Sequence, residues 1–147
     1  MAQVMSYGTK MIRGQTGRQV FTAVDSAAND SDKTLTVPAG QVWDIDVLNI
    51  TLATSADVGN RQITVVVSDG TNTLATLNAE ANQAASLTEY YCYSPKYGTA
   101  SEAPTGWHYI PLPPHILPAA ATIRVYDSAA VAAAADDLTV VAYGTLL

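Results

Sequence analysis

The two histidines, His108 and His115, are the first candidates for metal-binding or acid–base chemistry in this chain. They flank a proline-rich bend in the segment HYIPLPPH. A metal site inside a β-barrel needs several histidines and a carboxylate that converge on one point, and two histidines supply too few ligands. We therefore predict no metal site and no cofactor.

The segment DSAANDSD offers a second possible cation site. Asp25, Asn29, Asp30 and Asp32 carry side-chain oxygen atoms of the kind that calcium prefers. The segment lacks the central glycine and the terminal bidentate glutamate of an EF-hand loop, and its residues are ordinary turn formers. We interpret it as a solvated loop.

Nucleophilic catalysis has little support in the sequence. The chain has no G-x-S-x-G segment, and its single cysteine, Cys92, lies among tyrosines without a basic neighbour. Cys92 is expected to be a small buried hydrophobic residue. A retaining glycosidase would need two carboxylates about 5–5.5 Å apart, and the 13 acidic residues cannot be paired from sequence alone. We predict that the protein is not an enzyme.

Aromatic residues are densest between positions 90 and 109. This stretch contains Tyr90, Tyr91, Tyr93, Tyr97, Trp107 and Tyr109. Strand alternation would put Tyr91 and Tyr93 on one face and Tyr90 with Cys92 on the other. Such rings can fill a core, anchor a subunit interface or stack on sugars. The candidate partner-binding residues are Tyr91, Tyr93, Tyr97, Trp107 and Tyr109.

Charge is unevenly divided along the chain, whose net charge is −6. Residues 1–20 contain Lys10, Arg13 and Arg18 and no acidic residue, a net charge of +3, so the remainder carries −9. An acidic body repels phosphate backbones, which argues against nucleic-acid binding. The basic segment favours contact with the acidic surface of a neighbour, although a solvated leader would have the same composition.

The low content of charged residues also bears on whether the protein has partners. Charged residues make up 14% of the chain, against roughly 25% in typical soluble domains. Either other subunits cover much of the surface, or the surface is a threonine-coated β-sheet that needs no partner. No apolar run approaches the roughly 20 residues that span a bilayer, and the N-terminus lacks the apolar stretch of a secretory signal. We expect no membrane association and synthesis in the cytoplasm.

Period-two patterning predicts strands along most of the chain. Residues 38–40 (Pro-Ala-Gly) predict a turn, and Asp69-Gly70 predicts the turn of a hairpin. After Val47 the apolar positions change parity, which indicates a β-bulge or a strand that bends between sheets. The pattern predicts an all-β, antiparallel sandwich of about eight strands, jelly-roll-like in its connections.

The alanine-rich segment DSAAVAAAADD is too short to form a stable helix without support, so residues 128–136 are predicted to be a loop between two strands. We divide the chain into an extended N-terminal arm, residues 1–32, and one jelly-roll domain, residues 33–147.

Two segments resemble small jelly-roll proteins of tailed-bacteriophage virions. LTVPAGQVWDI is similar to a strand–turn–strand near the start of such proteins, and TIRVYDSAAVAAAADDLTVV is similar to their closing strands. The resemblance implies a capsid decoration (cement) protein, or a head-fibre protein. The implied location is the capsid surface of the virion, and the implied partner is the major capsid protein. It also implies a homo-oligomer, dimer or trimer. The alternative function is a glycan-binding, receptor-binding module of a tail fibre or other appendage.

Overall fold

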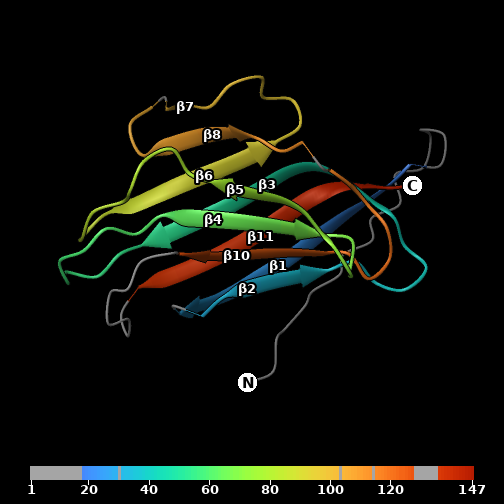
Figure 1. The fold of residues 1–147 in the computed structure, drawn as a ribbon, viewed down its shortest axis with the longest axis horizontal. Helices are drawn as coiled ribbons and strands as arrows, with labels where there is room; N and C mark the ends of the chain where they lie inside the picture. The colour runs from blue at the N-terminus through green and yellow to red at the C-terminus, as the bar shows by residue number, and fades with distance from the viewer. Residues whose placement is uncertain (1–17, 30, 103, 114, 128–135) are drawn as a thin grey trace.

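The computed structural model describes residues 18–29, 31–102, 104–113, 115–127 and 136–147. These residues form eleven β-strands and no helix. The strands make two sheets that pack face to face, and Figure 1 looks through both layers. The predicted all-β sandwich is therefore confirmed.

The larger sheet has seven strands. In spatial order they are β1 (Gln19–Asn29), β11 (Asp137–Leu146), β3 (Trp43–Ala53), β6 (Thr88–Ser94), β8 (Trp107–Pro111) and β7 (Ser101–Glu102), and β9 (Ile116–Leu117) pairs with β3. The smaller sheet contains β2 (Lys33–Thr36), β10 (Thr122–Asp127), β4 (Ile63–Ser68) and β5 (Thr73–Asn78).

Eight of the strands have the connections of a jelly roll. The order β1-β11-β3-β6 makes one four-stranded layer and β2-β10-β4-β5 makes the other. Strands adjacent in sequence mostly lie in opposite layers, as two Greek keys require. The other three strands, β7 to β9, lie in the chain between β6 and β10 and extend the larger sheet. The predicted jelly-roll character holds, with three strands more than expected.

One pairing departs from the predicted antiparallel arrangement. Strands β6 and β8 are parallel, from Tyr90 opposite Trp107 to Ser94 opposite Pro111. A parallel pair needs a crossover connection of about a dozen residues, which residues 95–106 provide. Local patterning could not reveal this direction, because both strands alternate in the same way.

Strand β1 belongs to the sandwich and not to the arm. It pairs with β11 from Gln19 opposite Leu146 to Asp25 opposite Val140. Its inward residues Phe21 and Ala23 are buried in the core. The predicted boundary at residue 32 is corrected, since the sandwich already begins at residue 19.

The predicted β-bulge in β3 is confirmed. Ile45 and Leu48 are both buried although an odd spacing separates them, and the β3–β11 register shifts between Tyr143 and Gly144. A β-carbon at Gly144 would overlap the backbone carbonyl of Asp44. The bulge therefore requires glycine on the opposite strand.

Both predicted turns are also found. Gly40 has φ +77° and Gly70 has φ +100°, conformations that glycine adopts without steric cost. The Gln41 amide donates to the Pro38 carbonyl at 3.2 Å. Strands β4 and β5 form the predicted hairpin. Of the predicted loop, residues 128–135 lie outside the described residues.

Candidate interaction surface

The parallel register of β6 and β8 brings the aromatic residues together in cross-strand pairs. Tyr90 stacks on Trp107, with ring centroids 4.4 Å apart and planes 17° apart. Tyr91 stacks on His108 with centroids 4.7 Å apart. Since side chains alternate along each strand, these two pairs lie on opposite faces of the larger sheet.

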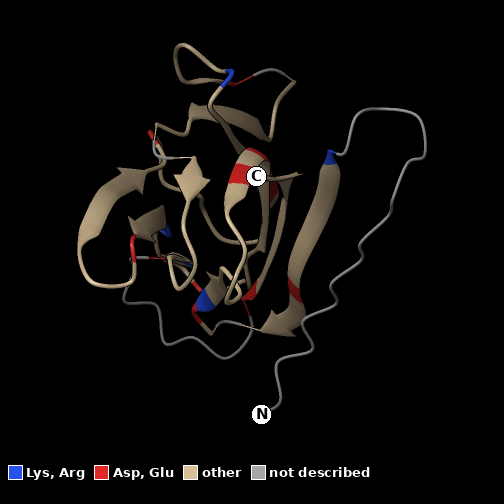
Figure 2. Cartoon of the chain, turned by 90° about the vertical axis from the view of Figure 1, so that its right-hand side faces the viewer, with Lys and Arg blue, Asp and Glu red and all other residues tan. Residues whose placement is uncertain are grey.

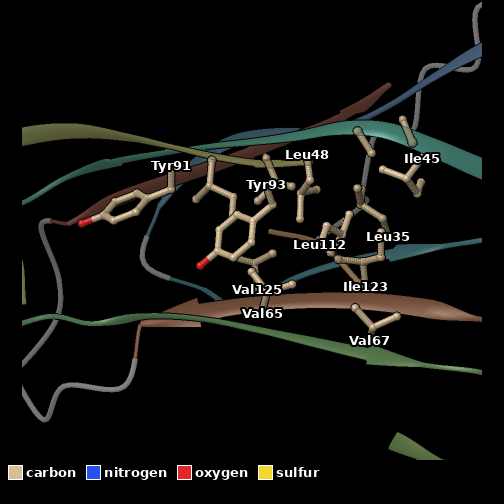
Figure 3. Packing of buried hydrophobic residues seen from close by; sticks show 14 of the residues in the cluster. Leu35, Ile45, Leu48, Val65, Val67, Tyr91, Tyr93, Leu112, Ile123 and Val125 are labelled. Atoms are coloured by element: carbon tan, nitrogen blue, oxygen red, sulfur yellow. The ribbon is translucent and has the colours of Figure 1, made fainter. Parts of the chain in front are cut away.

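Tyr91 and Tyr93 point inward. Their exposed fractions are 1% and 0%. Figure 3 shows the Tyr93 ring pointing from β6 toward Val65 and Val125 of the smaller sheet. Burial raises the pKa of both phenols, and the nearby carboxylate of Glu89 raises that of Tyr91 further. These two residues are corrected from candidate partner contacts to core residues, because no partner can reach their rings.

The remaining candidate rings gather on the outer side. Trp107 is 37% exposed, and Tyr97 contacts Tyr109 edge to face with centroids 5.3 Å apart. Tyr90 joins them by stacking on Trp107, although the sequence did not single it out as a contact residue. We call Tyr90, Tyr97, Trp107 and Tyr109 the aromatic ridge. In the stacked Tyr90–Trp107 pair each ring covers one face of the other. The pair therefore offers a sugar less ring surface than two separate rings would.

The ridge borders a larger surface that we call the outer face, the side of the larger sheet that points away from the smaller sheet. One cross-strand row contains Val24, Val141, Asn49, Cys92 and Tyr109. A parallel row contains Thr139, Thr51, Tyr90 and Trp107. None of these positions holds a charged residue.

The cysteine lies in the first row, between Asn49 and Tyr109. Cys92 is 6% exposed, and its sulfur is 2.9 Å from Asn49 Oδ1. Burial raises the pKa of the thiol, so the protonated, unreactive form is favoured. The expectation of a small buried residue is confirmed.

The three basic candidate residues belong to the start of the chain. Lys10 and Arg13 lie outside the described residues. Arg18 is exposed and immediately precedes β1, the edge strand of the larger sheet. Figure 2 shows how few Lys, Arg, Asp and Glu positions mark the described part of the ribbon.

His108 takes part in a polar network that the sequence did not indicate. Its Nε2 atom is 3.0 Å from Glu89 Oε2. The Tyr91 hydroxyl lies 3.1 Å from the same oxygen and 3.1 Å from Gln83 Oε1. This network joins β6, β8 and the loop before β6. Glu89 and His108 are 19 residues apart, and only the unforeseen parallel pairing brings them together.

A small pocket of about 80 Å³ adjoins this network, lined by Glu80, Ala81, Ala100, Ser101, Glu102, His108 and Ile110. The pocket holds two carboxylates and one imidazole at the open edge of the sandwich. A second, more open pocket of about 240 Å³ lies at the end of the ridge, lined by Pro95, Tyr97, Pro111, Leu112 and Pro113.

A lysine lies close to oxygen atoms of the segment DSAANDSD, the possible calcium site in the sequence. Lys33 is 1% exposed, and its ammonium donates at 2.6 Å to both the Ala27 carbonyl and Asn29 Oδ1. Asp25 Oδ1 lies 3.9 Å from the same nitrogen. The solvated-loop interpretation is therefore wrong for the first part of the segment, which belongs to β1 and faces a cation of the chain itself. Asp32 instead forms an exposed pair with Arg124, and Asp30 lies outside the described residues. The sequence signal was the lysine directly after the acidic run.

Arg61 and Asp136 form a buried ion pair. The guanidinium donates to both carboxylate oxygens, at 2.7 and 3.1 Å, and the Ser55 amide donates to Asp136 at 2.7 Å. Burial works against the charged carboxyl group, but these hydrogen bonds outweigh it and hold the pKa of Asp136 below its ordinary value. The pair ties the start of β11 to the loop between β3 and β4. It stabilises the fold and offers no exposed chemistry.

Among the described residues, no group of three or more His, Cys, Asp or Glu side chains is placed to hold a metal ion. The same residues include no helix long and apolar enough to cross a membrane.

Comparison of the chain with protein-family models, with curated proteins and with solved structures gave no match. Function must therefore be argued from the surfaces described above.

Proposed function

We propose that this protein is a capsid decoration (cement) protein of a tailed bacteriophage. It is a structural, non-catalytic protein that binds the outer surface of the head and stabilises contacts between major capsid subunits. The jelly-roll sandwich is compatible with this role but does not assign it, because the fold hosts many functions.

The observation that carries the proposal is the division of charge at the edge of the larger sheet. The basic first 20 residues (+3) join an acidic body (−9) at β1, which is an edge strand. A segment that enters at a sheet edge can extend over a neighbouring molecule without crossing its own core. In this proposal Lys10, Arg13 and Arg18 bind acidic groups on the shell.

The resemblance of two segments to phage virion proteins supports the same role. The first segment supplies the end of β2, the turn at Gly40 and the start of β3. The second contains β10 and the first part of β11. Both therefore contribute to the sandwich, and the contact with the shell is assigned to the basic segment.

The test is binding to heads that lack this protein. Purified protein is mixed with the heads, unbound protein is removed by sedimentation, and bound copies are counted per particle. We expect saturation at a number that matches the symmetry of the shell, together with greater resistance of the heads to heat. A folded protein that does not bind would refute the proposal.

The contribution of the arm is tested by replacing Lys10, Arg13 and Arg18 with alanine. Three exposed ion pairs at about 0.5 kcal/mol each predict roughly tenfold weaker binding at low salt. The control replaces Lys96 and Arg124, two basic residues of the body that pair with Asp46 and Asp32. Equal loss of binding per charge removed in the two variants would remove the arm from the proposal.

The second candidate function is glycan binding. The open pocket beside Tyr97 favours it, because a volume of about 240 Å³ with an aromatic wall suits one sugar ring. Retention on host-surface polysaccharide that is lost in Tyr97→Ala would support this function. Retention that survives the substitution would exclude this pocket.

A further inference from the structure

The outer face of the larger sheet is a broad surface of mostly uncharged side chains in a protein with 20 charged residues. Beside the two rows described above, a third row contains Thr22, Tyr143 and Val47. The three rows cross β1, β11 and β3, and two of them continue over β6 and β8. None of their positions is acidic or basic. Tyr143 is 41% exposed, so a large ring stands on the floor of this surface.

From this surface we propose that two copies of the chain associate outer face to outer face, about a two-fold axis. The proposal does not rest on the capsid role, because it concerns the protein alone. Three properties of the outer face favour a second copy as the partner: its charge, its shape and its area.

The net charge of −6 opposes self-association unless the charged residues of the two copies stay apart. Contact through the outer face brings few charged residues together. Asp137 lies beyond the row that contains Thr139, and Asp46, the extra residue of the bulge, lies beside Val47 in the third row. Asp46 is already paired with Lys96 at 3.1 Å. A charged partner would instead have to desolvate its charges against threonine and valine, without compensation.

The shape of the face is complementary to itself. The β6–β8 side carries the aromatic ridge, whereas the β1 side carries short Val and Thr side chains such as Val24 and Thr22. A two-fold axis near the middle of the sheet places the ridge of one copy over the low side of the other. Isologous contacts require this self-complementarity. Two twisted sheets can pack in this way with their strands about 30° apart, as the layers of a sandwich do.

The area is sufficient for a weak dimer. From strand spacing and rise, the three rows cover about 25 Å by 20 Å, or about 1,000 Å² for two copies. Specific interfaces begin at about this size. We therefore expect a dimer with a dissociation constant of about micromolar or weaker.

The experiment is sedimentation velocity on the full chain over a concentration series. The wild-type protein is compared with Val141→Lys, which puts a charge in the central row. The matched control is Val66→Lys, a half-buried outward valine at the centre of the smaller sheet. Tyr143→Lys is a second face variant at a more exposed site, in case the first does not fold. Circular dichroism and thermal unfolding identify the folded variants.

A wild-type dimer that both folded face variants disrupt, and that Val66→Lys leaves intact, supports the proposal. The dimer should also persist when salt is raised, because no ion pair forms it, whereas binding of the basic arm to the shell should weaken. A wild-type protein that stays monomeric would overturn the proposal, whether or not another molecule binds the outer face. So would a dimer that survives Val141→Lys and Tyr143→Lys, or one that Val66→Lys disrupts equally.

Discussion

Two tyrosines on one strand, Tyr91 and Tyr93, should respond in opposite ways to the same substitution. Both rings are buried, and phenylalanine would keep the packing of each. The Tyr91 hydroxyl lies within 3.1 Å of Gln83 and Glu89, whereas the Tyr93 hydroxyl has no hydrogen-bond partner among the described residues. The two substitutions therefore differ only in the hydrogen bonding of the hydroxyl that is removed.

The magnitudes follow from the cost of burying a polar group. An unpaired buried hydroxyl costs about 1–3 kcal/mol, so Tyr93→Phe should raise the free energy of unfolding by about that amount. At this chain length each kcal/mol corresponds to about 4 °C in Tm. Tyr91→Phe should lower the free energy of unfolding by about 1–3 kcal/mol, because it removes a hydrogen bond within the network around a carboxylate.

Alkaline titration gives an independent check on the same pair. The pKa of each phenol is raised in the folded protein, so above about pH 10 the unfolded chain loses these protons first. Stability is then lost as the pH rises, by about 1.4 kcal/mol per pH unit for each tyrosine. Each Phe variant should show a shallower decline than the wild-type protein.

Urea denaturation at neutral and alkaline pH measures both effects. If Tyr93→Phe destabilises the protein as much as Tyr91→Phe does, the Tyr93 hydroxyl has a partner and the reasoning is refuted.

Three further substitutions test buried polar and steric features, each by chemical denaturation. Asp136→Asn should cost about 3–5 kcal/mol, because it leaves Arg61 buried without its counter-charge. The lowered pKa of Asp136 adds stability that the wild-type protein loses as the pH falls below about 4, and the variant should lack that part of the acid loss. Lys33→Met should cost about 1–3 kcal/mol by leaving the Ala27 and Asn29 oxygens without their donor, whereas Lys96→Met, at an exposed site, should stay within about 0.5 kcal/mol of wild type. Gly144→Ala should cost about 1–3 kcal/mol or more through its overlap with Asp44, and Gly98→Ala, which meets no neighbouring atom, should be nearly neutral. Equal effects in either matched pair would contradict the corresponding geometry.

The candidate surface was only partly predictable, because its geometry depends on the parallel pairing of β6 and β8, which local sequence patterns do not reveal. Alternation correctly separated Tyr91 from Tyr90, but it did not say which face was buried. The answer came from the smaller sheet, which covers Tyr91 and Tyr93 and leaves Tyr90 and Trp107 outside. The Glu89–His108 contact was out of reach for the same reason, since β6 and β8 meet only through a crossover.

Buried charges were the other feature that local patterns missed. Lys33 and Arg61 belong to residue types that usually lie at the surface, and charged side chains are rarely buried unless they are paired. Their partners lie in other segments, Asn29 and Ala27 for the lysine and Asp136 for the arginine. Asp136 follows an alanine run, where the sequence predicted only a loop.

The features that could be predicted from sequence are local ones. Period-two alternation set the strands, Gly40 and Gly70 set their turns, and the change of parity after Val47 set the bulge. Each of these depends on backbone sterics and on which side of one strand is apolar. The tertiary structure alone decided that β1 joins the larger sheet, that β6 and β8 run parallel, and that Arg61 meets Asp136. These are contacts between distant segments, and they are fixed by the packing of two sheets around one core.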